Sequence, residues 1–207
     1  PTNDCFSIKS TRNFKQVVIT PKKFGFIVEV QYEKENLSKV KGKGVCCIDI
    51  GLNNLAAITS DQFSTILVNG RILKSINQWY NKCPSKRNGN KRYFRIENYF
   101  HHVSKMIIEL CLKNNCGTII IGKNDSWKQG MNLGKKTNQN FQYIPFCRLI
   151  EKINYKAELF GIKIVLTEES YTSKASFLDR DTLPKYEQGV KHVFSGKRVK
   201  RGLYCAS

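Results

Sequence analysis

A single carboxylate inside an apolar stretch is the feature of this sequence with the clearest chemical meaning. Asp49 lies within Val45-Cys-Cys-Ile-Asp-Ile50, a run that otherwise has the composition of a buried strand. Burying a carboxylate is costly unless a partner offsets its charge, and a metal ion is one such partner. The alternative is structural, with Asp49 capping the turn that begins at Gly51. The residues around Asp49 leave both interpretations open.

A fold that could position this acid follows from the order of apolar and polar stretches. Residues 45–50, 55–59 and 63–68 are short apolar runs separated by tight turns, which predicts an antiparallel meander. The next predicted elements are a helix over 72–82, a basic turn over 84–92, a helix over 92–115, a buried strand over 117–122, a polar loop over 123–139, a helix over 145–160 and a buried strand over 162–167. The fold class is therefore α/β, a mixed sheet with flanking helices. A meander that opens with an acid and continues α-β-α-β has the order of an RNase H-like domain.

Two regions are expected along the chain. Residues 1–43 contain two β-like stretches, 14–20 and 24–32, and end in a basic, glycine-containing linker. We place the boundary before Gly44, which gives a short β-rich segment over 1–43 and a larger domain over 44–207. The last part of that domain, 171–207, is polar, and we expect it to be irregular.

The chain carries a large excess of positive charge. Lysine and arginine number 35, against 16 aspartates and glutamates, so the formal net charge is +19. This excess predicts a polyanionic partner, with nucleic acid favoured over an anionic membrane surface because no basic amphipathic helix with a clean apolar face is evident. The sequence has no apolar run of about 18 residues, so we expect no membrane span.

The cysteines and the N-terminal residues bear on the cellular compartment. Eight cysteines are present without any Cys-x-x-Cys pair, which argues against a zinc ribbon and indicates reduced thiols. The opening residues Pro1-Thr-Asn-Asp4 do not have the apolar core of a signal peptide. We expect a cytoplasmic protein that binds no zinc.

The chemistry available to an RNase H-like domain is metal-assisted hydrolysis. Nucleases of this fold hold two divalent ions between carboxylates, and the ions stabilise the attacking and leaving oxygens at a phosphodiester. Hard oxygen ligands suit Mg²⁺ or Mn²⁺. An enzyme of a different class stays open, because Asp49, Gly51 and Asn53 also fit the D-x-G-x-N phosphate loop of actin-like ATPases. That alternative predicts ATP binding and gives the net charge no role.

A series of motifs occurs in a characteristic order between residues 45 and 204. They are Ile48-Asp-Ile-Gly-Leu-Asn-Asn-Leu-Ala56, Ile119-Ile-Ile-Gly-Lys-Asn124, Trp127-Lys-Gln129, Asn138-Gln-Asn-Phe141, Pro145, Tyr155-Lys-Ala-Glu158, Gly161-Ile162, Glu168-Glu-Ser-Tyr-Thr-Ser-Lys174 and Phe194-Ser-Gly-Lys-Arg-Val-Lys-Arg201. In this order they resemble the RuvC-type domain of the TnpB (OrfB) transposon-associated proteins. Residues 1–43 resemble the end of the β-rich nucleic-acid-binding domain that precedes RuvC in that family.

The resemblance implies an RNA-guided, metal-dependent DNA endonuclease of a mobile element. The family is similar to the type V CRISPR effectors, in which base pairing reads the target and a basic channel holds the heteroduplex. The implied partners are DNA and a guide RNA, with no obligate small-molecule substrate. The positive charge of this chain fits that role independently.

The second acid departs from the family pattern. The family's acid follows the central strand, where this chain has Lys123, and a protonated lysine cannot ligate a metal. Some branches of the family have moved a glutamate to the next strand, so we select Glu169 as the second ligand and Glu168 as the reserve. Adjacent strands lie about 4.8 Å apart, which puts that strand roughly 10 Å from Asp49, and a glutamate leaning inward would close much of the gap. The alternative is a solvated glutamate pair at a strand end.

The third acid and the zinc ribbon of the family also have no counterpart here. The family's last motif carries an Asp beside Asn-Ala or Asn-Gly, and this chain stops at Ser207 before such a motif. We do not assign Asp179 or Asp181 to that role, and we expect a C-terminally truncated fragment that cleaves weakly or not at all alone. A non-enzymatic alternative is an RNA-guided DNA-binding protein or decayed remnant that binds without cutting.

Candidate nucleic-acid contacts are basic, polar and aromatic residues near the predicted site or in the C-terminal tail. They are Lys123, Asn124, Trp127, Lys128, Gln129, Phe141, Lys174, Lys197, Arg198, Lys200 and Arg201. Aromatic side chains can stack on bases and cations can contact phosphates. For Trp127 and Phe141 the alternative is packing of the loop against the sheet, and for the cations it is a solvated surface.

Overall fold

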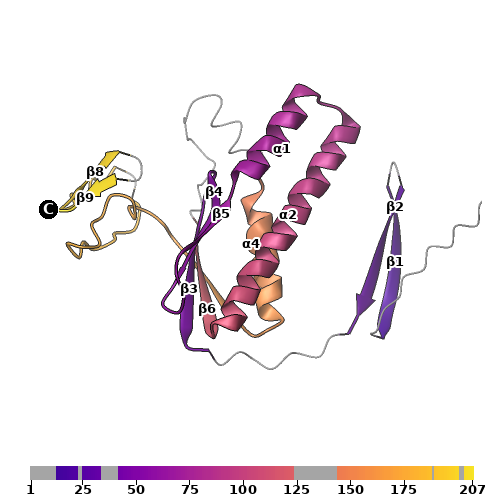
Figure 1. Cartoon of the computed structure of the whole chain (residues 1–207), viewed down its shortest axis with the longest axis horizontal. Helices are drawn as coiled ribbons and strands as arrows, with labels where there is room; N and C mark the ends of the chain where they lie inside the picture. Colours follow the sequence, from indigo (N-terminus) through magenta and orange to yellow (C-terminus); the bar gives the residue numbers. More distant parts are fainter. Residues whose placement is uncertain (1–12, 23–24, 34–41, 124–143, 188, 201–202) are drawn as a thin grey trace, which may run out of the picture. The chain divides into compact units, whose positions relative to one another are not determined.

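A computed structural model describes residues 13–22, 25–33, 42–123, 144–187, 189–200 and 203–207 (Figure 1). The chain divides into two compact units, Pro1–Ser38 and Lys39–Ser207. In the first unit, strands β1 (Phe14–Lys22) and β2 (Gly25–Tyr32) pair as an antiparallel hairpin. The two strands predicted in this segment are confirmed. The boundary predicted before Gly44 falls where the next strand begins.

A five-stranded mixed sheet forms the centre of the second unit. Its strands are β3 (Gly44–Ile50), β4 (Asn54–Ser60), β5 (Ile66–Asn69), β6 (Cys116–Gly122) and β7 (Lys163–Thr167). The order across the sheet is β5-β4-β3-β6-β7. β3 and β5 pair antiparallel with β4, whereas β6 pairs parallel with both β3 and β7. The predicted meander and the predicted mixed sheet are both confirmed.

Three helices share one apolar core with one face of the sheet (Figure 1). They are α1 (Arg71–Lys82), α2 (Lys86–Lys113) and α4 (Phe146–Glu158). Alternate residues of β3 face this core, so Cys46, Ile48 and Ile50 are almost fully buried. The same core contains Phe100 of α2 and Ile153 of α4. The other residues of β3 point to the opposite face of the sheet.

The start of α2 differs from the prediction. We predicted a basic turn over 84–92, because Pro84, Asn88 and Gly89 are typical of turns, but α2 already begins at Lys86. Ser85 caps the helix, since its hydroxyl oxygen accepts a hydrogen bond from the Asn88 amide at 3.1 Å. Asn88 Nδ2 also donates to the Cys83 carbonyl at 2.7 Å. These local hydrogen bonds stabilise the first turn of α2, and the helix forms although it contains Gly89.

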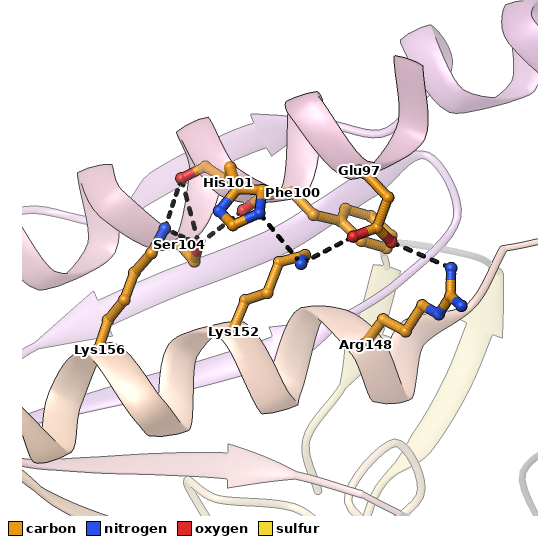
Figure 2. Close-up of polar contacts among 7 residues, drawn as sticks. All are labelled: Glu97, Phe100, His101, Ser104, Arg148, Lys152 and Lys156. Carbon is orange, nitrogen blue, oxygen red and sulfur yellow. Dashed lines mark hydrogen bonds and ion pairs between the residues drawn. The ribbon is translucent and has the colours of Figure 1, made fainter. Parts of the chain in front are cut away.

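A polar seam joins α2 to α4 (Figure 2). Lys152 of α4 lies 2.7 Å from Glu97 Oε2, and Arg148 lies 3.2 Å from Glu97 Oε1. Lys156 donates to Ser104 Oγ at 2.7 Å, and burial lowers its pKa, with further lowering by the positive charge of Lys152. Glu97 is therefore the acid that compensates two cations, and its side chain is only 16% exposed.

The C-terminal segment contains a short hairpin that the sequence did not predict. β8 (Lys197–Lys200) pairs antiparallel with β9 (Leu203–Cys205). The hairpin was missed because the four residues of β8 are basic apart from Val199 and show no apolar alternation, and β9 has only three residues. Elsewhere 171–207 has no regular strand or helix over the residues that the structure describes.

None of the helices in the described parts of the whole chain has the length and apolar character needed to cross a membrane.

Candidate active site

Asp49 lies near the end of β3, on the sheet face that the helices leave open. Its neighbours Ile48 and Ile50 are each 2% exposed and point into the core, whereas Asp49 is exposed. Ile48 pairs with Ile121 of β6 in parallel register. Asp49 therefore lies beside Gly122, the last residue of β6.

Glu169 follows β7 on the far side of β6. Gly122 pairs with Thr167, and the Lys123 amide donates to the Thr167 carbonyl at 2.8 Å, so the ends of β6 and β7 are held together. The chain turns immediately after Glu169, because the Thr172 hydroxyl donates to the Glu169 carbonyl at 2.9 Å. This turn fixes the backbone from which the Glu169 side chain extends.

The Glu169 carboxyl lies over Gly122, between its own strand and that of Asp49. A Cβ placed on Gly122 would be 1.7 Å from Glu169 Oε1, which shows how closely the carboxyl approaches the β6 backbone. Burial raises the pKa of Glu169 to about 7, and the negative charge of Asp49 contributes in the same direction. The structure thus brings Asp49 and Glu169 together at one mouth of the sheet.

Glu168, the reserve ligand, lies in a different environment. It is exposed, and Ser170 Oγ donates a hydrogen bond to its Oε1. Successive residues of an extended segment point to opposite sides, which separates Glu168 from the face that carries Glu169. Glu169 is the candidate that lies near Asp49, whose negative charge contributes to the raised pKa of Glu169.

Two carboxylates in this arrangement repel each other and favour a cation between them. Their oxygens are the hard ligands that suit Mg²⁺ or Mn²⁺, so the donor set fits such an ion. Across the described ranges no group of three or more His, Cys, Asp or Glu side chains could hold a metal. Among the residues that the structure describes, a divalent ion at this site would therefore find two carboxylate ligands, those of Asp49 and Glu169.

The loop acids Asp179 and Asp181 are engaged elsewhere. Asp181 accepts hydrogen bonds from the Ser176 amide at 2.8 Å and from Ser195 Oγ at 2.6 Å. Asp179 accepts one from the Ser207 amide at 3.1 Å. Hydrogen bonding lowers the pKa of both carboxyls, first through the Ser176 side chain for Asp179 and through the Ser176 amide for Asp181, and it ties the C-terminal segment together.

The candidate nucleic-acid contacts fall into three groups. Lys123 is half-buried and directly follows Gly122, the last residue of β6. Lys174 is exposed, with its Nζ 5.9 Å from the centre of the Tyr171 ring. Lys197, Arg198 and Lys200 are exposed along β8. The remaining candidates lie outside the described residues: Asn124, Trp127, Lys128, Gln129, Phe141 and Arg201.

Comparison with known proteins finds similarity to Cas12f1 in sequence and in fold. No protein-family model matches this sequence. Over 74 residues, 36% of the chain, it is 34% identical to the CRISPR-associated endodeoxyribonuclease Cas12f1 of Sulfoacidibacillus thermotolerans, of which it covers 16%. The structure matches 77% of the chain to Cas12f1 in its complex with sgRNA and target DNA, with a TM-score of 0.50 and 15% identity. A CRISPR-Cas12f ternary complex matches with a TM-score of 0.51 and 17% identity, also over 77% of the chain.

The chain shares a mixed α/β fold with Cas12f1. It covers 43% of one Cas12f1 chain and 36% of the Cas12f chain in the other complex. It therefore spans less than half the length of the proteins that it matches. Its similarity to Cas12f1 in sequence is confined to 74 residues, and its similarity in fold extends over most of the chain.

Two residues of the site were not found from the sequence. Gly122 provides the space under the Glu169 carboxyl, and Thr172 closes the turn after Glu169. A glycine that ends the run Ile119-Ile-Ile was a signal for Gly122, because glycine in a strand marks a close approach. Thr172 gave no comparable signal, since its role depends on a turn that the sequence did not predict.

Proposed function

We propose that this chain is part of an RNA-guided, divalent-metal-dependent DNA endonuclease of the TnpB and Cas12 kind, encoded by a mobile element. The sheet order β5-β4-β3-β6-β7, with an acid on its central strand, supports an RNase H-like domain of the RuvC type. The similarity to Cas12f1 over 74 residues supports the same kind of nuclease.

The observation that carries this proposal is the convergence of Asp49 and Glu169. The Glu169 carboxyl lies over Gly122, near the exposed Asp49 on the sheet face opposite the helices. Mg²⁺ or Mn²⁺ held there would stabilise the charge that develops on phosphate oxygens during hydrolysis. Asp49 and Glu169 would hold the ion. Because the raised pKa of Glu169 favours its protonated form, binding of the ion would release that proton. The remaining ligands would come from water, from a phosphate or from acids beyond these two.

Exposed basic side chains support DNA and guide RNA as partners. The net charge of +19 suits a phosphate-rich ligand. Arg198 of β8 lines a pocket with Leu178 and Tyr204, next to the 94% exposed ring of Phe177. Apolar and aromatic surface beside cations suits an unpaired base and its phosphate. Lys123, Lys174, Lys197 and Lys200 would contact the backbone, and the candidates outside the described residues belong to the same proposal.

The experiment that tests this function recovers the RNA first. The chain is expressed together with the DNA that flanks its gene, and the RNA that copurifies with it is sequenced. We expect one RNA species whose variable end directs the complex to a matching DNA duplex in Mg²⁺. Retention of mixed cellular RNA, with equal binding to matched and unmatched duplexes, would contradict an RNA-guided role.

A second candidate is an RNA-guided protein that binds DNA without cutting it. It is favoured by the finding that the described residues bring together two carboxylates rather than three. Asp49→Asn separates the two functions, because it removes a metal ligand and leaves the basic residues in place. Cleavage that disappears in Asp49→Asn while binding persists supports the nuclease. Binding without cleavage in both proteins supports the second candidate.

A further inference from the structure

We propose that Gly122 is a positioning residue of the carboxylate site, because its missing side chain leaves the space in which the Glu169 carboxyl lies beside Asp49. The inference rests on the proposed function of that carboxylate pair. It adds a residue that takes no part in ligation and yet determines whether the two ligands can meet.

The strand register places Gly122 midway between the two acids. β6 lies between β3 and β7, and Gly122 pairs with Thr167 on one side while Asp49 lies beside it on the other. Glu169 comes two residues after Thr167. Its side chain must therefore cross the end of β6 to approach Asp49, and Gly122 is the residue that it crosses.

The space over Gly122 is occupied by Glu169 itself. A Cβ on Gly122 would lie 1.7 Å from Oε1, 2.3 Å from Cδ and 2.5 Å from Cγ of Glu169. All three distances are far below van der Waals contact between heavy atoms. Any side chain at position 122 would force the Glu169 carboxyl to leave this position.

Backbone conformation does not explain this glycine. The described glycines with positive φ are Gly25, Gly161 and Gly189, and Gly122 is not among them. Alanine could therefore adopt the Gly122 backbone without strain. The three atoms nearest to a Cβ at position 122 all belong to the Glu169 side chain, so this side chain is the obstacle that the glycine avoids.

Gly117, at the other end of β6, gives a contrasting case. A Cβ there would lie 2.0 Å from the Gly42 carbonyl oxygen, which is backbone. Alanine at position 117 would therefore strain the chain and lower stability. Alanine at position 122 would instead displace the flexible Glu169 side chain. This change would alter the carboxylate site without straining the backbone.

The test measures the affinity of the 207-residue chain for Mn²⁺ by isothermal titration calorimetry. We expect Gly122→Ala to weaken Mn²⁺ binding about 10-fold or more, the size of effect seen when a metal ligand is misplaced. Gly89→Ala is the matched control, since its Cβ would lie 3.7 Å from Tyr80 Cε2, an ordinary van der Waals contact. Equal affinity of Gly122→Ala and the wild type would overturn the inference.

A double-variant cycle separates positioning from a general structural effect. Glu169→Ala removes the atoms that obstruct position 122, so adding Gly122→Ala to it should not lower stability and should leave the residual Mn²⁺ affinity unchanged. This comparison also decides the matter if Gly122→Ala alone folds poorly. A double variant that is much less stable than Glu169→Ala would show that Gly122 serves the backbone, and would refute the proposal.

A metal-free readout distinguishes failure of this inference from failure of the proposed function. Carbon-13 NMR of the glutamate carboxyls follows the titration of Glu169 directly. In Gly122→Ala, displacement of the carboxyl should lower the pKa of Glu169 toward that of an ordinary glutamate, whether or not the protein binds metal. If the wild type binds no Mn²⁺, the proposed function fails while this NMR result still tests Gly122. An unchanged Glu169 titration in Gly122→Ala would overturn the positioning role.

Discussion

Replacing Glu169 by glutamine should stabilise the protein at alkaline pH. In the native state the pKa of Glu169 is raised from 4.5 to about 7, by burial first and by the charge of Asp49 second. The native state therefore holds this proton more tightly than the unfolded chain does. Ionisation of Glu169 lowers the free energy of unfolding as the pH rises from 4.5 to about 7, and the loss is complete above this window. Glutamine is neutral at every pH and escapes this loss.

The size of the effect follows from the pKa and from solvent screening. One pKa unit corresponds to about 1.36 kcal/mol, so a rise from 4.5 to about 7 sets an upper limit of roughly 3 kcal/mol. Glu169 is half-buried, and solvent screens part of this energy. We expect Glu169→Gln to gain about 1–2 kcal/mol at pH 8. Each kcal/mol corresponds to about 2–4 °C in Tm for a domain of this size.

Thermal unfolding monitored by circular dichroism, in metal-free buffer, measures this difference between pH 4.5 and pH 8. The gain should be largest at pH 8 and should narrow toward zero near pH 4.5. Glu168→Gln is the matched control, because Glu168 is the adjacent, exposed carboxylate and should change Tm little at either pH. A Glu169→Gln protein that is less stable than the wild type at pH 8 would refute the reasoning.

Three further predictions concern the metal, the helix seam and the basic hairpin. Mn²⁺ at about 100 times its Kd should stabilise the wild type by about 2.7 kcal/mol, and Asp49→Asn should lose this gain. An equal Tm shift in both proteins would show that the ion binds elsewhere. Glu97→Gln should cost about 2 kcal/mol in urea unfolding because it leaves Lys152, whose side chain is only 14% exposed, without its compensating charge. Glu109→Gln should cost under about 0.5 kcal/mol, since its pair with Lys105 is exposed. Similar costs for these two variants would contradict the role of the seam. Alanine at Lys197, Arg198 and Lys200 should reduce the slope of log K against log salt for duplex DNA by about 2–3. An unchanged slope in a binding titration would remove β8 from the interface.

Strands and helices were predictable where local chemistry decides them. Hydrophobic runs separated by turn residues predicted β3, β4 and β6, and helical spacing predicted the body of α2 and α4. The start of α2 was not predictable from turn propensity, because the Ser85 cap converts a turn-like sequence into a first helical turn. The hairpin β8–β9 was missed since exposed basic strands show no apolar pattern.

The residue types of the site and the strands that carry them were predictable, but the space that admits the Glu169 carboxyl was not. Asp49 stood out as an acid in an apolar strand, and Glu169 stood just past a neighbouring strand. Their approach depends on parallel register across three strands and on an empty space over Gly122, which are properties of the assembled sheet. The choice between Glu168 and Glu169 likewise required knowing which side of the sheet each faces.

X-ray diffraction from crystals of this chain grown with Mn²⁺, recorded near the manganese absorption edge, tests the central claim most directly. If the two acids form one cation site, an anomalous peak will lie between the carboxyl groups of Asp49 and Glu169, within bonding distance of an oxygen from each. Manganese peaks that lie only away from this end of the sheet, at Mn²⁺ concentrations that saturate binding, would contradict the claim of a shared cation site.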